Sequence, residues 1–239
     1  MLESITDPGV REGHYAAKQI FCRAGLIAWS HRRRFEVGLR LARRFAGRRI
    51  LDYGCGDATF LALLQATPNR PAVSVGAELD ESEHVGAYDA VVCMEVLEHV
   101  VTLDEVLARL WRVLAAEGTA LVSVPVETGL PLVVKQAVRR IAGWRGIGDY
   151  PGTSSYTIGE LCAGLVAGSR PHLRRPVHGV AGPTPFHDHK GFNWMVLQAR
   201  LGAFFEIDEV VAAPLPWLGP HLATQVWFVG RKRRVPDPA

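Results

Sequence analysis

The spacing of apolar positions changes several times along the first quarter of the chain and divides it into helical and extended stretches. Residues 14–46 contain no proline and carry apolar side chains at helical spacing, which predicts one or two helices ahead of the main fold. Residues 49–53 (RILDY) predict a short buried strand. A glycine-rich turn at 54–56 then leads into an apolar run at 59–64 that is typical of a helix. A strand, a glycine turn and a helix therefore open the main fold.

Strands and helices continue to alternate in the middle of the chain. Residues 72–75 and 88–93 are strand candidates, and the continuous apolar character of 88–93 suits a parallel strand covered on both faces. Residues 102–115 predict an amphipathic helix that ends before Gly118, and 119–124 form the next strand. This alternation predicts a doubly wound α/β sheet with right-handed crossovers and a ligand site at the carboxyl ends of its strands.

The pattern weakens at 127–185, where a basic helix at 132–144 precedes a stretch rich in Gly, Pro and Ser. Regular spacing returns with a helix at 192–201 and strands at 204–211 and 224–230. We expect these two strands to form an antiparallel pair at the edge of the sheet. Residues 127–185 are interpreted as an insertion in the main domain.

Composition narrows the class of protein. With 239 residues and 48% hydrophobic content, the chain fits one α/β domain with insertions, and a net charge of +3 argues against a nucleic-acid partner. The four cysteines form no Cys-x-x-Cys pair, so neither a disulfide framework nor a zinc knuckle is predicted. The N-terminal residues lack a signal pattern and no apolar run approaches the ~20 residues of a membrane span, so we expect a cytoplasmic protein.

The glycine turn carries the main chemical signal, because a strand that ends in an acid and runs into Gly-x-Gly lets the backbone approach a ligand closely. The string ILDYGCGDATFL resembles the first motif of class I S-adenosylmethionine-dependent methyltransferases. YDAVVCMEVLEHV and RVLAAEGTALVSVP resemble the fourth-strand and fifth-strand segments of that family, in the expected order.

The resemblance implies a Rossmann-like, mostly parallel sheet with an antiparallel closing strand, N-terminal helices and a helical insertion after the fifth strand. It implies S-adenosylmethionine as cofactor, with Asp52, Gly54 and Gly56 against its amino-acid end and Cys55 and Cys93 also in its site. We expect an N-terminal helical extension at 1–47, the methyltransferase domain at 48–232 with 127–185 as insertion or lid, and a tail at 233–239.

One residue and one spacing depart from the family pattern. Ala58 stands where the family often has a third glycine, and a small side chain should be tolerated there. About a dozen residues separate Val75 from Tyr88, too few for the usual helix and third strand. Either Glu78 binds the ribose and the third strand is lost, or 73–76 is itself the third strand; we favour Glu78.

A second motif points to a metal. Glu95, Glu98 and His99 are spaced i, i+3 and i+4, which on a helical turn would present two carboxylates and an imidazole on one face. The alternative is that these are structural residues, because Glu-His is common at this place in metal-free methyltransferases that resemble this chain. The later run HDHKGFNW adds His187 and His189.

Together these motifs resemble the metal-dependent small-RNA 2′-O-methyltransferases, which implies Glu95, Glu98, His99 and His189 as ligands. Gly191 is an extra residue relative to that pattern, and Asn193 replaces a glutamate. Glu-x-x-Glu-His also resembles the ubiquinone-pathway O-methyltransferases. The ligand types leave magnesium, manganese, iron, cobalt and zinc open. His99, His187 and His189 are the candidate catalytic side chains, since a base must take the acceptor's proton.

The insertion bears on the acceptor. Its basic helix has an apolar stripe and is either a lid for an anionic or lipid-linked acceptor or a helix packed on its own domain. The resulting hypotheses are metal-assisted O-methylation of a sugar or other vicinal diol in a glycan or natural-product pathway, metal-free methylation of a small molecule, and non-catalytic cofactor binding or membrane docking. We favour the first, with a small-molecule or glycan acceptor and peripheral membrane contact as a further expectation.

Overall fold

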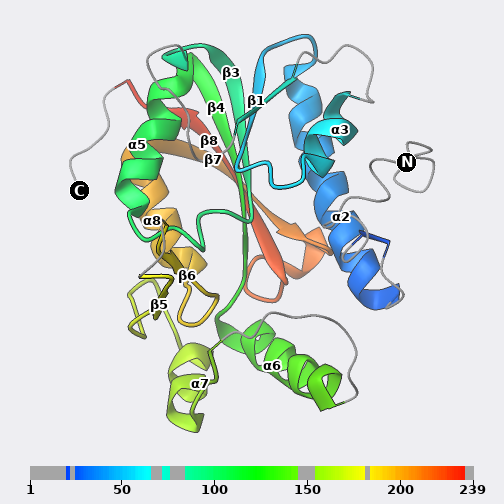
Figure 1. Cartoon of the computed structure of the whole chain (residues 1–239), viewed down its shortest axis with the longest axis vertical. Coiled ribbons are helices and arrows are strands. Elements are labelled where there is room, and N and C mark those ends of the chain that lie inside the picture. Colours follow the sequence, from blue (N-terminus) through cyan, green and yellow to red (C-terminus); the bar gives the residue numbers. More distant parts are fainter. Residues whose placement is uncertain are drawn as a thin grey trace.

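A computed structural model of the chain describes residues 20–21, 25–65, 72–75, 84–144, 154–180 and 184–234. At its centre is a six-stranded sheet in the order β2-β1-β3-β4-β8-β7, drawn in Figure 1. The strands are β1 (Ile50–Tyr53), β2 (Ala72–Val75), β3 (Tyr88–Met94), β4 (Leu114–Pro125), β7 (Phe205–Ala213) and β8 (Gln225–Lys232). The first four are parallel, and β8 is antiparallel to both β4 and β7. The predicted mostly parallel sheet with an antiparallel closing pair is confirmed.

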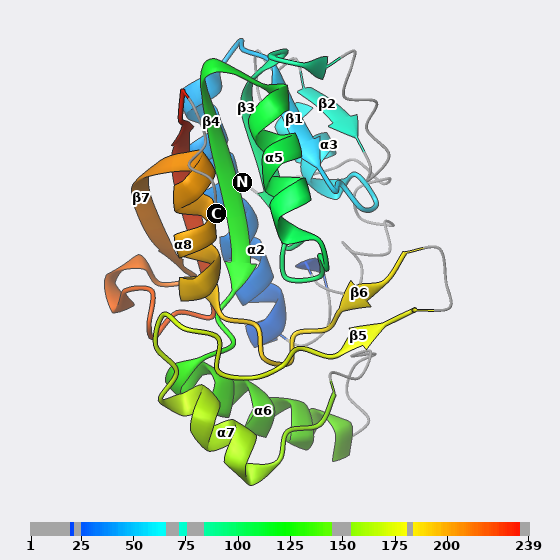
Figure 2. The ribbon, with the colours of Figure 1, turned by 90° about the vertical axis from the view of Figure 1, so that its left-hand side faces the viewer.

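Helices cover both faces of the sheet (Figures 1 and 2). The helices are α2 (Gly25–Ala42), continued by the 3-10 turn η3 (Arg43–Phe45), α3 (Thr59–Gln65), α5 (Leu103–Val113) and α8 (Trp194–Phe204). Strand β3 shows why both faces are needed: Val91 and Cys93 lie in the core under α5 and α8, whereas Ala90 and Val92 lie in the core under α2 and α3. The continuous apolar pattern of 88–93 thus reflects burial on two sides.

The structure places two boundaries differently from the sequence pattern. Strand β4 begins at Leu114, immediately after α5, and Gly118 lies inside the strand rather than between helix and strand. The early start is a pairing effect, because Leu114 pairs with Tyr88 across a register shift in β3. Strand β2 pairs directly with β1, and within the described ranges no strand lies beyond β2 at that edge. The predicted helical stretch before residue 20 and the ribose acid Glu78 lie outside the described residues.

The insertion lies beyond the carboxyl end of β4, at the bottom of Figure 1. It comprises α6 (Gly129–Trp144), α7 (Ile158–Leu165) and the short antiparallel pair β5 (Val177–His178) and β6 (Phe186–His187). Helix α7 starts at a capping box in which Thr157 and Glu160 each bond the other's backbone amide. The 3-10 turn η4 (Pro216–Leu218) joins β7 to β8. Among the described helices, none has the length and apolarity to cross a membrane.

Candidate functional site

The turn between β1 and α3 has the backbone that its glycines predict. Gly54 and Gly56 have φ angles of +75° and +56°, in the left-handed region that glycine enters freely. A Cβ at Gly54 would come within 2.5 Å of Val96 Cγ2, whereas nothing lies within 4 Å of a Cβ at Gly56. Asp57 ends the turn by accepting hydrogen bonds from the amide and hydroxyl of Thr59, at 3.2 and 2.6 Å. The backbone beside Gly56 is therefore open to a ligand.

Asp52 lies at the end of β1, directly before this turn. Its side chain is 2% exposed, and its Oδ2 atom has no hydrogen-bond partner. Burial raises the pKa of the Asp52 carboxyl from 3.8 to about 7, because a charge without a partner is poorly solvated there. A buried unpartnered carboxylate next to open backbone fits a ligand with an ammonium group, which S-adenosylmethionine carries. Asp52, Gly54 and Gly56 are thus brought together as expected.

The other predicted cofactor residues are placed less favourably. Cys55 is half-buried in the turn, and its thiol donates to the Gly56 carbonyl at 4.0 Å. Cys93 is fully buried in the core under α5 and α8, where burial raises the pKa of its thiol, with the charge of Glu98 next in effect. Nothing in its surroundings distinguishes it from a core residue. The position of Glu78 is outside the described residues.

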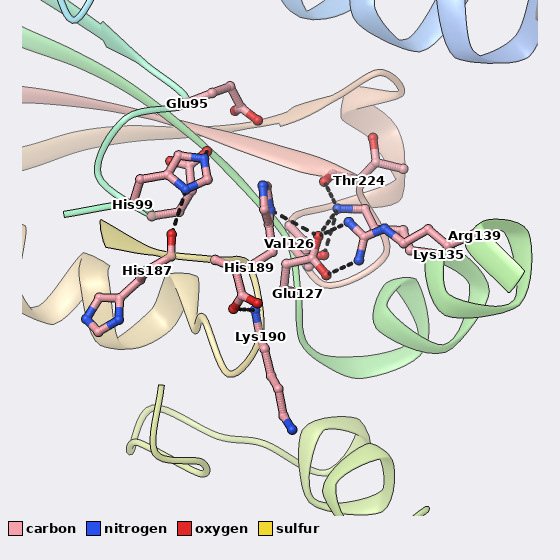
Figure 3. Close-up of polar contacts among 12 residues, drawn as sticks. Glu95, His99, Val126, Glu127, Lys135, Arg139, His187, His189, Lys190 and Thr224 are labelled. Atoms are coloured by element: carbon pink, nitrogen blue, oxygen red, sulfur yellow. Dashed lines mark hydrogen bonds and ion pairs between the residues drawn. The ribbon is translucent and has the colours of Figure 1, made fainter. Parts of the chain in front are cut away.

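The prediction of a helical turn after β3 is wrong. Glu95 has a φ of +56°, and residues 96–100 form a non-helical turn, so the i, i+3, i+4 spacing does not put three ligands on one face. The physical reason lies in the partners of Glu95: Ser123 Oγ donates to its carboxylate at 2.7 Å, and buried Arg34 pairs with it at 3.1 Å. Figure 3 shows the Glu95 side chain apart from the rings of His99 and His189. Glu95 therefore stabilises the turn and lies outside the group described next.

Three of the four predicted ligands do converge. One potential ligand atom from each of Glu98, His99 and His189 lies within 4.8 Å of the other two. The rings of His99 and His189 meet edge to face, with centroids 5.0 Å apart. Glu98 is 0% exposed, and neither of its carboxylate oxygens has a hydrogen-bond partner. Burial, with the charge of Glu95 next, raises its pKa well above the ordinary value.

A backbone contact fixes the tautomer of the His99 ring. His99 Nδ1 lies 2.8 Å from the His187 carbonyl oxygen, which can only accept, so Nδ1 carries a proton. Burial lowers the pKa of His99, which favours the neutral ring. The lone pair is then on Nε2, 3.8 Å from the nearer Glu98 oxygen. His99 thus presents an imidazole nitrogen toward Glu98.

The segment that carries His189 is tied to the turn after β3. The His187 amide donates to the His99 carbonyl at 2.9 Å, and the Arg175 guanidinium donates to the carbonyls of Glu98 and Asp188. The His187 ring takes no part in the group, because its Nδ1 bonds the Pro176 carbonyl at 2.7 Å and the ring points away in Figure 3. Of the three candidate catalytic histidines, the structure brings together His99 and His189.

Glu127, at the end of β4, is a site residue that the sequence did not reveal. It is fully buried, with Lys135 at 3.1 Å, Arg139 at 3.0 Å and His189 Nδ1 at 3.6 Å from its Oε1 (Figure 3). Burial alone would raise the pKa of Glu127, but the charges of Lys135 and Arg139 and the contact with His189 hold it below the ordinary value. The one available signal was Lys135 and Arg139 at i and i+4 on a helix, which does not identify their partner.

The donor set fits a divalent cation. Three atoms bound ~2.1 Å from one ion at tetrahedral angles are ~3.4 Å apart, so ligand atoms as far apart as 4.8 Å would have to approach one another by up to about 1.4 Å. Two imidazole nitrogens and a carboxylate oxygen suit zinc, iron, cobalt or manganese better than magnesium, which prefers oxygen ligands. An ion here would give the unpartnered oxygens of Glu98 the positive charge that their burial demands.

Comparison with known proteins identifies the family of the fold. Residues 28–163, more than half of the chain, match the family described as "Methyltransferase domain". This stretch contains the cofactor turn, Glu98 and His99, whereas His189 lies beyond it.

Proteins similar to this chain include one curated relative and two solved structures. The ubiquinone biosynthesis O-methyltransferase of Psychrobacter arcticus is 28% identical over 130 residues, covering 42% of this chain and 48% of that protein, so the chain spans about half the length of this relative. The PH0226 protein of Pyrococcus horikoshii OT3 has a TM-score of 0.51 at 13% identity, over 85% of this chain and 91% of that one. The cyclase SpnF also has a TM-score of 0.51, at 12% identity, over 89% and 83% of the two chains. At these identities the two structures establish the fold alone.

Proposed function

The chain belongs to the methyltransferase domain family, and on this premise we propose that it transfers the methyl group of S-adenosylmethionine to a hydroxyl of a vicinal-diol or sugar-like acceptor, assisted by a divalent metal at Glu98, His99 and His189. The observation that carries the proposal is Glu98, fully buried with both carboxylate oxygens unpartnered beside two imidazoles. The name of the curated relative supports oxygen as the acceptor atom.

The reaction breaks the bond between the methyl carbon and sulfur and forms a bond to the acceptor oxygen, with release of S-adenosylhomocysteine and of the hydroxyl proton. When bound, a divalent ion would lower the pKa of a coordinated hydroxyl, and two adjacent hydroxyls could chelate the ion. The chain's own part is binding and orientation. Asp52 offers its unpartnered oxygen to the amino group of the cofactor, and the turn at 54–56 lets the backbone approach. The bond of His99 to the His187 carbonyl holds its ring toward Glu98.

Titration calorimetry on metal-stripped protein tests the metal site, with manganese, zinc and S-adenosylhomocysteine as ligands. We expect Glu98→Gln and His189→Ala to weaken metal binding at least 10-fold, because each removes one of three ligands. His187→Gln is the matched control, since the His187 ring is adjacent in sequence but outside the group. Binding of S-adenosylhomocysteine should persist in all three variants. Metal binding that is equally strong in Glu98→Gln would refute the ligand set.

A second candidate is metal-free methyl transfer with His99 as the base. Its lowered pKa and its protonated Nδ1 leave a free lone pair on Nε2 at neutral pH, which is what a general base needs. In that case the protein binds S-adenosylhomocysteine but no metal, and its activity resists chelators. An acceptor screen that compares diols with matched single alcohols, with and without chelator, separates the two candidates. Only metal assistance predicts both a diol preference and loss of activity on chelation.

A further inference from the structure

Helix α6 packs against the domain with its polar side. Lys135 and Arg139 reach back to Glu127, Lys135 also donates to the carbonyls of Val126 and Thr224, and Leu132 is buried. An ordinary surface helix has the opposite arrangement, with its apolar stripe toward the core and its charges toward water. The sequence left open whether this helix is a lid or is packed on its own domain. It packs on its own domain, but through its cations and not through its apolar stripe.

The outward side of α6 is apolar. Six large apolar side chains on this helix are between 37% and 84% exposed: Leu130, Val133, Val134, Val138, Ile141 and Trp144. Positions 130, 134, 138 and 141 follow one another at intervals of four, four and three residues, which at 3.6 residues per turn makes one continuous stripe. The neighbouring helix α7 also exposes two large apolar side chains, Ile158 and Leu165. An exposed apolar patch of this extent marks an interaction surface.

Charge indicates what covers this surface. Residues 127–185 contain seven Lys and Arg against three Asp and Glu. Lys135, Arg139 and Arg175 are turned inward, so the outward positive charge comes from the exposed arginines. Helix α6 itself has no acidic residue. Arg140, Arg170 and Arg174 are exposed in this part of the molecule. A second copy of the chain would bring two positive surfaces together, whereas an anionic bilayer offers apolar depth and opposite charge at once.

We propose that α6, with α7, lies on the surface of a bilayer that contains anionic lipids, with the apolar stripe at the boundary of headgroups and acyl chains. Glu127 lies between β4 and α6, contacts Lys135 and Arg139 of α6, and is 3.6 Å from His189 Nδ1 (Figure 3). Docking would therefore bring the site close to the membrane surface. The proposal does not depend on the metal or on the acceptor, because it concerns only the outer face of the insertion.

Vesicle flotation with the full chain tests the proposal. Vesicles of phosphatidylcholine with about 30% phosphatidylglycerol are compared with vesicles of phosphatidylcholine alone, each at about 50 mM and about 300 mM salt. We expect the protein to float with the anionic vesicles at low salt and at least 10-fold less without phosphatidylglycerol. The double variant Val134→Glu/Ile141→Glu should lose flotation, and Arg140→Glu should weaken it several-fold. Val85→Glu is the matched control, because Val85 is 62% exposed at the opposite, amino end of β3.

Two results would overturn the proposal. One is absence of flotation with anionic vesicles at low salt, or flotation of the double variant equal to that of the original protein. The other is a concentration-dependent dimer in sedimentation that the double variant abolishes, which would assign the stripe to a second copy of the chain. Binding of S-adenosylhomocysteine by each variant shows that it is folded, so that loss of flotation is not loss of structure.

Discussion

Glu127 joins the candidate metal group to the insertion. Its carboxylate lies 3.6 Å from His189 Nδ1, so Nε2 is the nitrogen of His189 that remains for a metal. Carboxylates that contact the far nitrogen of a histidine ligand fix its ring and raise its basicity. Because Lys135 and Arg139 hold Glu127 ionised, the contact should persist across the neutral pH range.

We therefore predict that Glu127→Gln lowers metal affinity about 10- to 100-fold without removing a ligand. Calorimetry gives the affinity, and the absorption bands of bound cobalt report a change in the orientation of His189. Lys135→Gln is the control, because it disturbs the same buried network but leaves the contact between Glu127 and His189. An equal loss of metal affinity in both variants would mean that Glu127 acts only by stabilising the buried network, and not through His189.

Asp52 predicts a pH dependence of stability. Its folded-state pKa of about 7 is higher than the unfolded value near 3.8, so between these values the folded state holds a proton that the unfolded state has lost. Stability from this group is complete below pH ~4 and is lost as pH rises through ~7, by up to about 4 kcal/mol. Denaturant unfolding from pH 5 to 8 should show a shallower fall for Asp52→Asn than for the original protein. Parallel curves for the two proteins would contradict the prediction.

At the residue scale, the sequence predicted what depends on near neighbours. Asp52, Gly54 and Gly56 lie within five residues, and their relative positions follow from one local turn. Glu127 was missed because its contacts come from helix α6 and from His189, 62 positions away. The resemblance selected His189 over His187 as a ligand, but the sequence left both as candidate catalytic side chains, since their separation depends on whether a ring meets the Pro176 carbonyl or Glu127.

At the scale of elements, the turn between β1 and α3 contains a strained residue. Ala58 has a φ of +59°, a conformation that costs an L-residue roughly 1–2 kcal/mol relative to glycine. Its amide bonds the Cys55 carbonyl, and its carbonyl accepts from Ala62, so the turn and the start of α3 hold it there. Ala58 thus holds a backbone conformation that glycine would enter freely.

We predict that Ala58→Gly stabilises the protein by up to about 1 kcal/mol, because relief of strain exceeds the added freedom of the unfolded chain. Thermal unfolding should show a rise of roughly 2–4 °C per kcal/mol in a chain of this length. Ala62→Gly, inside α3, serves as the matched control and should be destabilising by about 1 kcal/mol. A lower melting temperature for Ala58→Gly would show that the turn relaxes in solution.

The apolar periodicity predicted most helices and strands, but not which partners their side chains contact. The apolar spacing of 132–144 indicated a helix, yet it could not show that its cations point inward, because Glu127 lies outside the helix. The same limit applied to Glu95, whose helical spacing to Glu98 and His99 was overridden by Arg34 and Ser123. Where a segment's partners come from another element, local spacing is a weak guide.

At the scale of the molecule, the insertion has a much smaller apolar core than the sheet. Within its described helices Leu132 is the one large apolar side chain in the buried core, whereas β3 and β4 are buried along most of their length. We predict that amides of α6 and α7 exchange with deuterium through openings of lower free energy than those of β4 and β8. Hydrogen exchange followed by mass spectrometry measures this order. Equal protection would mean that the insertion and the sheet unfold as one unit.

The order of strands in the sheet also has a consequence for synthesis. Strand β8 lies between β4 and β7, so β7 can join the sheet only through a strand that the ribosome makes after it. Until residues 225–232 have left the exit tunnel, the apolar strand β4 has an open edge on a nascent chain that has already completed the cofactor turn. A stop codon before β8 would leave a chain prone to aggregate through β4 rather than a merely shortened enzyme.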